Sequence, residues 1–259
     1  MSTHPLMSKT KNLIRSLIQK IIFQPNIRNN IVRRYLEVTE TREWFIHQIA
    51  MNETRQKAEF NQAPIKRLSK IQGFEDCYWL FSSNELNLGL SQLRFDDAAY
   101  LYQQLLCRNH PRVAEIGRYK GGTTFLLAAA GAEVLSLEID PAVQDRYVPP
   151  LIRTLDHFGL GDKVDARLAD AYSYDLGSNS FDFVLVHCSP PSYEHTRMLA
   201  ERWWQAISVG GYLILHATPY LPGELKFIEE MSNSVEAWNA VIEPNTPGEN
   251  VYFKKIGKL

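Results

Sequence analysis

A carboxylate stands directly before a cluster of glycines in residues 112–141. Glu115 lies two residues before Gly117, and Gly121 and Gly122 follow. This spacing differs from the G-x-G-x-x-G fingerprint of dinucleotide sites, whose close first pair of glycines lets a pyrophosphate approach. A carboxylate at position 115 would repel a pyrophosphate, whereas it would attract a ligand with a cationic end. These residues therefore favour a cofactor site of another kind.

The glycines require a particular set of elements around them. An apolar run at 113–116 predicts a strand, the glycines predict a tight turn, and the following apolar residues predict a helix and a second strand at 133–139. The helix would direct free backbone N–H groups at the turn. Glu138 then falls where such folds place an acid on a ribose diol. The alternative is a glycine-rich turn in an α/β protein that binds nothing.

Strands and helices alternate along the rest of the chain, which predicts an α/β fold with a doubly wound, mostly parallel, seven-stranded sheet. A helix is expected from Asp96, as its cap, to Leu106. Another is expected after Pro141, to about Phe158, with an interruption at Pro149 and Pro150. A helix after Ser192 should end at the glycines before 212–216. The seven expected strands are 113–116, 133–139, 164–168, 181–187, 212–216, 235–243 and 250–256.

The order of these motifs resembles the class I S-adenosylmethionine (SAM) methyltransferases, from about Asp96 to the C-terminus. Glu115 and Gly117 match the family's first motif, and Asp170, within Ala169-Asp170-Ala171, matches the acid that bonds the adenine amino group. The resemblance implies a Rossmann-like methyltransferase domain at 91–259 that follows a helical N-terminal extension at 1–90. SAM is then the expected cofactor, held by Glu115, Gly117, Gly121, Gly122, Glu138 and Asp170.

Within that class, FDFVLVH, SYE and GGYLILHAT are similar to the O-methyltransferase branch that includes macrocin-type sugar methyltransferases. In that branch, aspartates after the fourth and fifth strands help to hold a divalent metal. Here His187 stands at the first of these positions and Ala217 at the second. Because magnesium prefers oxygen ligands, no metal site is expected from these residues.

His187 and His216 end the fourth and fifth expected strands, which are neighbours in this family, so both should border the ligand crevice. A neutral imidazole there can accept the proton of a hydroxyl that is to be methylated. We expect His187 to be the principal base and His216 to orient it. The alternative is that each histidine simply bonds a neighbouring backbone group.

These features predict a SAM-dependent methyltransferase that O-methylates a small molecule, with a sugar or glycoconjugate hydroxyl as the favoured acceptor. The rival hypothesis is a non-catalytic SAM-binding or scaffold protein, since the metal aspartates are missing. The net charge of −1 over 259 residues gives no indication of a nucleic-acid partner. Three scattered cysteines indicate neither a disulfide framework nor a zinc site, which favours a reducing, cytoplasmic location.

The first 36 residues contain no acid, and apolar residues recur at helical spacing between basic ones. This pattern predicts an amphipathic basic helix that ends near Pro25. Three interpretations stay open: packing on the catalytic domain or on a second subunit in a homo-oligomer, peripheral contact with an anionic membrane, and a cleaved targeting segment.

Overall fold

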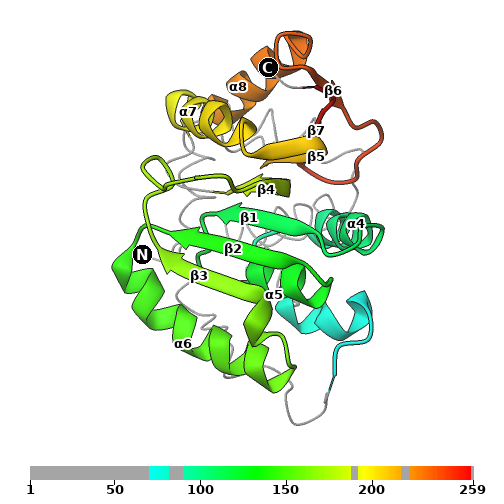
Figure 1. The fold of residues 1–259 in the computed structure, drawn as a ribbon. Helices are drawn as coiled ribbons and strands as arrows, with labels where there is room; N and C mark the ends of the chain where they lie inside the picture. The colour runs from blue at the N-terminus through cyan, green and yellow to red at the C-terminus, as the bar shows by residue number, and fades with distance from the viewer. Residues whose placement is uncertain (1–69, 82–89, 188–191, 217–221, 258–259) are drawn as a thin grey trace, which may run out of the picture. The chain divides into compact units, whose positions relative to one another are not determined.

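The computed structural model describes residues 70–81, 90–187, 192–216 and 222–257 (Figure 1). All of these residues belong to one compact unit, Gln56–Leu259. The predicted basic helix, the N-terminal extension up to residue 69 and position 217 lie outside the described residues. Among the residues that are described, none of the helices has both the length and the apolar character needed to cross a membrane.

Seven strands form one mixed sheet in the order β3-β2-β1-β4-β5-β7-β6 (Figure 1). β7 pairs antiparallel with β5 and β6, and the pairs among the first five strands are parallel. The prediction of a mostly parallel, seven-stranded sheet is thus confirmed. The strands are β1 (Arg112–Ile116), β2 (Glu133–Glu138), β3 (Val164–Leu168), β4 (Phe181–Val186), β5 (Ile207–His216), β6 (Ala240–Ile242) and β7 (Asn250–Lys255).

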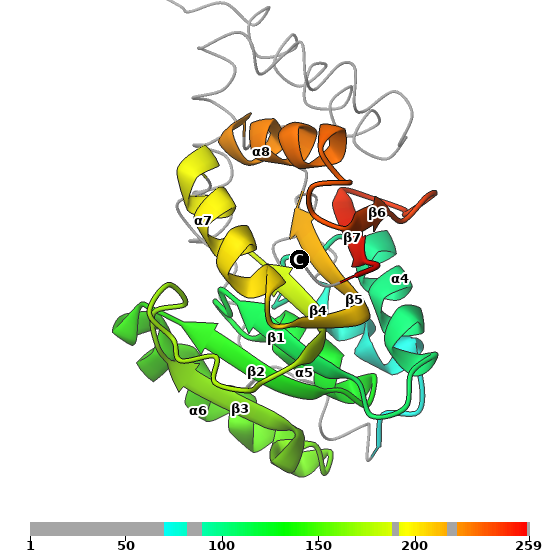
Figure 2. The same ribbon diagram turned by 45° about the horizontal axis from the view of Figure 1, so that its top comes forward.

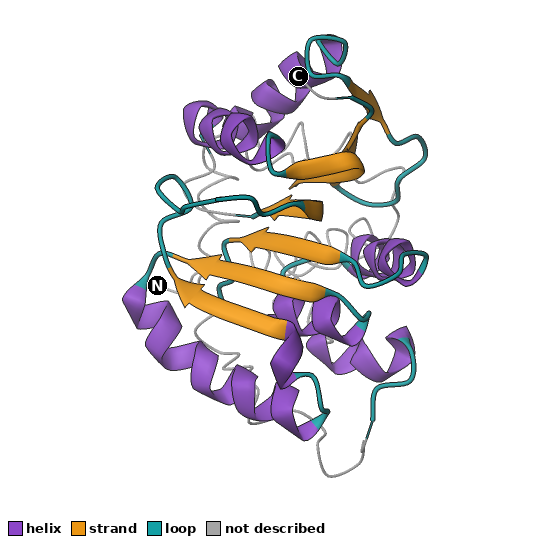
Figure 3. Cartoon of the chain, in the orientation of Figure 1, coloured by secondary structure: helices purple, strands orange, loops and turns teal. Residues whose placement is uncertain are grey.

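Helices pack on both faces of this sheet, and a separate apolar cluster fills each face (Figures 2 and 3). Residues of α4, α5 and α6 share one cluster with Val113, Phe183 and Ile214, whereas residues of α7 and α8 share the other with Val184 and Leu213. The central strands read as continuous apolar runs because both of their faces are covered. The helical elements are η2 (Phe74–Leu80), α4 (Phe95–Leu106), α5 (Gly122–Ala129), α6 (Pro141–His157), η3 (Gly161–Lys163), α7 (Tyr193–Trp204) and α8 (Pro222–Asn233).

Four local predictions differ from the structure. Of the strand expected at 235–243 only β6 (Ala240–Ile242) forms, and 235–239 is turn. Asp96 is not the cap of α4, because Arg94 occupies that position. Pro149 and Pro150 do not interrupt α6, which is capped by Asp140; the residues four positions earlier, whose carbonyls lose a partner, are exposed and can bond water. Gly210 and Gly211 lie inside β5, where the pairing with β4 shifts register.

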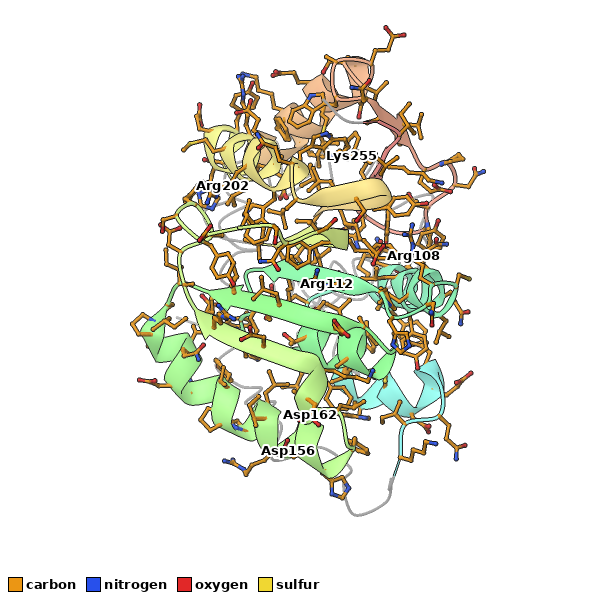
Figure 4. All side chains as sticks on the ribbon, viewed as in Figure 1. Arg108, Arg112, Asp156, Asp162, Arg202 and Lys255 are labelled. Carbon is orange, nitrogen blue, oxygen red and sulfur yellow. The ribbon has the colours of Figure 1, made fainter. Side chains whose placement is uncertain are left out.

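Buried and half-buried cations tie the elements together at the amino ends of the strands (Figure 4). Arg108 follows α4 and donates to Asp182 at 3.2 Å and to the carbonyl of Gly210 at 2.6 Å. Lys255, on β7, is 5% exposed and donates to the carbonyls of Trp204 and Ile207, at 2.8 and 3.0 Å. Its ammonium group therefore donates hydrogen bonds to carbonyl groups at and just after the end of α7.

The opposite edge of the sheet collects the predicted site residues. The parallel strands β1 to β5 all end there, and the antiparallel β7 begins there because Asn250 pairs with His216. We call this the carboxyl edge. The start of α4 also reaches it, since Asp97 accepts hydrogen bonds from Glu249 and Asn250. In open α/β sheets this is the edge at which ligands bind.

Candidate functional site

The turn after β1 is built from backbone that bends in unusual directions. Gly117 has φ of 90°, which glycine adopts without steric cost, and its N–H donates to the carbonyl of Leu137 at 3.0 Å. Tyr119 has φ of 51°, and its N–H donates to the carboxylate of Glu138 at 2.9 Å. The ends of β1 and β2 are therefore joined through Glu138.

The side chain of Glu115, on β1, is buried in the protein interior and is not exposed at the carboxyl edge. Its carboxylate is 1% exposed and accepts hydrogen bonds from the hydroxyls of Thr124 and Ser136, at 2.5 and 2.6 Å. Burial raises the pKa of Glu115 to about 7, although both hydroxyls and Arg118 oppose the shift. The expected contact with the cationic end of a cofactor stays a prediction; the contacts seen here fix α5 to β1 and β2.

Gly121 and Gly122 lack side chains for reasons of packing. A Cβ on Gly121 would lie 2.5 Å from Leu151, and the residue has φ of 85°. A Cβ on Gly122 would lie 2.1 Å from the backbone of Leu90 and Ser91. The N–H of Gly122 donates to the carbonyl of Leu90 at 3.1 Å, so this end of α5 is partly covered by the chain before α4. Their predicted contact with a cofactor is untested.

Glu138 ends β2 and Asp170 lies two residues after the neighbouring β3, and both hold backbone turns. Glu138 accepts from the N–H groups of Tyr119, Ile139 and Asp140, at 2.9 to 3.1 Å. Asp170 accepts from the N–H of Tyr172 at 2.9 Å. The side chain after Glu138, Ile139, is 63% exposed, which leaves an apolar surface beside the carboxylate.

The sequence did not single out Arg118, which follows Gly117 and is 3% exposed. Its guanidinium donates to the carbonyl of Ser136 at 2.7 Å and to the side chain of Gln144. Burial lowers its pKa, while the charges of Glu115 and Glu138 oppose that change. Arg118 thus places a buried positive charge near the carboxylates of Glu115 and Glu138, two of the predicted cofactor residues.

The two predicted histidines meet at the carboxyl edge, with ring centroids 5.2 Å apart. Nε2 of His187 is buried and has no hydrogen-bond partner among the described residues. Burial, followed by the neighbouring His216, lowers the pKa of His187 to about 3, so this ring is neutral at physiological pH and is a weak base. His216 instead has two polar neighbours: its Nδ1 lies 3.0 Å from Oδ1 of Asn250, and its Nε2 lies 3.9 Å from Oε2 of Glu249.

Two further carboxyl groups lie near this pair of histidines and were not predicted from the sequence to take part in a site. Glu224, in the first turn of α8, is 5% exposed and receives a hydrogen bond from the backbone of His216. Burial raises its pKa to about 8. Asp97 is fully buried, and burial raises its pKa to about 6. Asp97 could have been recognised in the sequence as a charged residue on the apolar face of a helix. No pattern in the sequence marks Glu224.

We expect the protein to lose stability between pH 6 and pH 9, and the Glu224→Gln variant to lose less. A raised folded pKa means that the folded state holds its proton more tightly than the unfolded state, so the stability from this group is lost as the pH rises through about 8. A difference of one in pKa corresponds to about 1.4 kcal/mol. Thermal unfolding at both pH values measures the effect.

The matched control is Glu229→Gln, an exposed glutamate on the same helix, which should keep the pH dependence of the wild type. Glu115, whose pKa is raised to about 7, contributes in the same direction in every variant, so the slope should be reduced and not abolished. An identical loss of stability in wild type and Glu224→Gln would show that the carboxyl of Glu224 is already ionised in the folded protein.

Within the described ranges, His, Cys, Asp and Glu side chains form no group of three or more that could hold a metal ion. His187 and His216 are thus two nitrogen ligands without a third among these residues. Of the two positions where the resemblance places metal-binding aspartates, 187 is a described histidine and 217 lies outside the described ranges. The expectation that no metal takes part is consequently a matter for experiment.

Comparison with known proteins gives a likeness in structure alone. The sequence matches no protein-family model and no curated protein. The O-methyltransferase NovP superposes with a TM-score of 0.50 and 14% identity, over 65% of this chain and 83% of that chain. A putative rRNA methylase from Clostridium thermocellum gives the same score and identity, over 64% of this chain and 99% of that chain.

A SAM-dependent O-methyltransferase from Thermotoga maritima gives a TM-score of 0.46 at 14% identity, over 64% and 67% of the two chains. At such identities the likeness defines a fold and leaves the acceptor and the macrocin-type branch as predictions. The described part of the chain has the Rossmann-like methyltransferase fold that NovP and the Clostridium thermocellum protein share.

Proposed function

We propose that this protein is a SAM-dependent methyltransferase that O-methylates a small molecule, with a sugar or glycoconjugate hydroxyl as the favoured acceptor. The observation that carries the proposal is the shared position of two groups of residues. Gly117, Glu138 and Asp170 lie at or just after the ends of β1, β2 and β3, and the paired histidines lie at or just after the ends of β4 and β5, all on the carboxyl edge. The first group suits a cofactor and the second suits an acceptor.

The residues around Glu138 fit the nucleoside part of SAM. A carboxylate offers about four acceptor positions, and backbone N–H groups fill three of them in Glu138. A ribose hydroxyl is a donor that suits the remaining position. The exposed side chain of Ile139 offers an apolar surface for a base, and Asp170 supplies an acceptor for an amino group. Gly117 lets the backbone approach the ligand without a side chain between them.

SAM, when bound, supplies a methyl group on a sulfonium, and the protein must orient the acceptor and remove its proton. His187 is poorly suited to take that proton, since its pKa is about 3 and its Nε2 is buried. His216 is better suited, because a positive charge on its ring would lie 3.9 Å from the Glu249 carboxylate. We therefore assign the proton to His216, and to His187 the role of a neutral neighbour of that ring.

The rival candidate is a SAM-binding protein without methyltransferase activity. The observation that favours it is the replacement of both metal-site aspartates of the resembling branch, by His187 and Ala217. Such a protein would keep the residues around Gly117 and Glu138 and would bind SAM, but no acceptor would be methylated. A panel of acceptors therefore has to accompany any measurement of cofactor binding.

Titration calorimetry should detect binding of SAM and no comparable binding of NAD. We expect Glu138→Ala to weaken SAM binding about tenfold, since loss of one hydrogen bond to a charged group costs about 1.5 kcal/mol or more. Glu133→Ala is the matched control, because Glu133 is exposed at the other end of the same strand. Tight NAD binding without a response to SAM would refute the proposal.

Release of S-adenosylhomocysteine separates the enzyme from the rival. We expect release with sugars or small glycoconjugates, and none with RNA, which is included because an rRNA methylase shares the fold. Methylation of RNA alone would retain the enzyme and overturn the acceptor class. SAM binding without release on any acceptor would favour the non-catalytic protein.

A further inference from the structure

We infer that the turn at residues 248–250, which leads into β7 and includes its first residue, is a positioning unit that holds the His216 ring in one tautomer and one orientation. The inference rests on the proposed function, in which His216 accepts the proton of the acceptor hydroxyl. Nothing in the residue pattern of the sequence pointed to this turn. Asn250 and Glu249 contact the ring, and Asp97 and Arg94 hold the turn.

The contacts at the ring fix which nitrogen carries the proton. Oδ1 of Asn250 lies 3.0 Å from Nδ1 of His216, and an amide oxygen can only accept a hydrogen bond. With the Asn250 amide in this orientation Nδ1 carries the hydrogen, which leaves the lone pair of the neutral ring on Nε2. The Glu249 carboxylate faces Nε2 at 3.9 Å, beyond hydrogen-bond distance but close enough to favour a positive charge on the ring.

The turn is held by a fully buried carboxylate. Asp97, on α4, accepts hydrogen bonds from the N–H groups of Glu249 and Asn250, each at 3.1 Å. Gly248 packs so closely on this carboxylate that a Cβ would lie 2.3 Å from it, and its φ is +78°. The turn therefore has one position relative to α4, and β7 carries that position to His216 through their backbone pairing.

The side chain of Glu249 is held independently of its backbone. Arg94, the residue that precedes α4, donates from Nη1 to Oε1 of Glu249 at 3.0 Å, and the two side chains are 17% and 10% exposed. This ion pair turns the other carboxylate oxygen, Oε2, toward His216. The groups that can change charge around the ring are thus Glu249 and Asp97 on one side, and His187 and Glu224 on the other.

This arrangement gives the proton transfer a defined course. The O–H bond of the acceptor would break and its electron pair would form the bond from oxygen to the methyl group. The methyl–sulfur bond would break with its electron pair left on sulfur, which gives S-adenosylhomocysteine, and the proton would pass to Nε2 of His216. The ring then carries one positive charge, with Nδ1–H still donating to Asn250 and the charge facing Glu249. Release of the proton to solvent restores the neutral ring, and no metal or further reactant is needed for the balance.

Three variants test the unit in the full-length protein. We expect Asn250→Ala to lower kcat about tenfold with SAM affinity unchanged, and Asn250→Asp to retain most of the activity because an oxygen is kept. We expect Glu249→Gln to lower kcat as well, because a neutral side chain no longer stabilises the positive charge that forms on the ring. Glu243→Gln, in the same connection between β6 and β7 but bonded to Tyr212, is the matched control.

A second readout needs no activity. Proton–nitrogen correlation spectra of ¹⁵N-histidine-labelled protein, with His216→Ala to assign the ring, should show the Nδ1–H tautomer in the wild type and its loss in Asn250→Ala. An Nε2–H ring in the wild type, or a tautomer that survives Asn250→Ala, would overturn the inference even in an active enzyme. Absence of SAM binding and turnover with the expected tautomer would instead refute the proposed function and leave the positioning unit standing.

Discussion

The His216→Ala variant is expected to lower kcat for methyl transfer by about 10²–10⁴-fold, the usual contribution of a positioned general base. SAM affinity should stay close to that of the wild type, because the residues assigned to the cofactor end other strands. The reason is the environment of the ring: Asn250 fixes its proton at Nδ1, and Glu249 stabilises the charge that forms. S-adenosylhomocysteine release under saturating SAM measures kcat directly.

The matched control is His187→Ala, which removes an equally large ring from the neighbouring strand. Since the pKa of His187 is lowered to about 3, we expect a loss of less than about tenfold. Reversal of the two effects would restore His187 as the principal base, which is the expectation from sequence. A chelator should leave both variants and the wild type unchanged; activity lost in chelator and restored by magnesium would mean that residues outside the described ranges bind a metal.

Much of the fold could be predicted because local patterns determine it. The apolar runs that became β1, β2 and β4 have both faces buried, so their composition alone identifies them. The placement of Glu138 beside the turn at Gly117 followed from the spacing within one strand-helix-strand unit. Asp96 shows what local patterns miss. Its residue type and place predicted a helix cap, but Arg94 occupies the cap position of α4 and Asp96 forms an ion pair with it.

The acceptor side was less accessible to prediction because its contacts join distant parts of the chain. Asp97 and Asn250 are 153 positions apart, and they meet only because β7 is inserted antiparallel beside β5. An asparagine at the start of a strand carries no pattern that marks it as the partner of a histidine. The burial of His187 also depends on contacts between distant parts of the chain. The sequence predicted that His187 borders the ligand crevice, but its low pKa comes from the residues that surround it in the folded protein.

The Gly122→Ala variant should be destabilised by roughly 3 kcal/mol, at the upper end of what added atoms cost in a well-packed interior. The new Cβ would lie 2.1 Å from the backbone of Leu90 and Ser91. Backbone cannot rotate away as a side chain can, so the segment before α4 would have to move. That movement would also break the hydrogen bond from Gly122 to Leu90, at 3.1 Å. Thermal unfolding should show a midpoint lowered by roughly 6–12 °C.

Gly73→Ala is the matched control for this effect. A Cβ at Gly73 would also meet an atom at a very short distance, 2.6 Å, but that atom is the carboxylate end of Glu75, an exposed side chain that can turn aside. We expect the change at Gly73 to stay within about 0.5 kcal/mol. Equal midpoints for the two variants would show that the Leu90–Ser91 backbone yields as easily as a surface side chain. In that case α5 would not be held by the segment before α4, and the absence of a side chain at position 122 would have to serve the ligand instead.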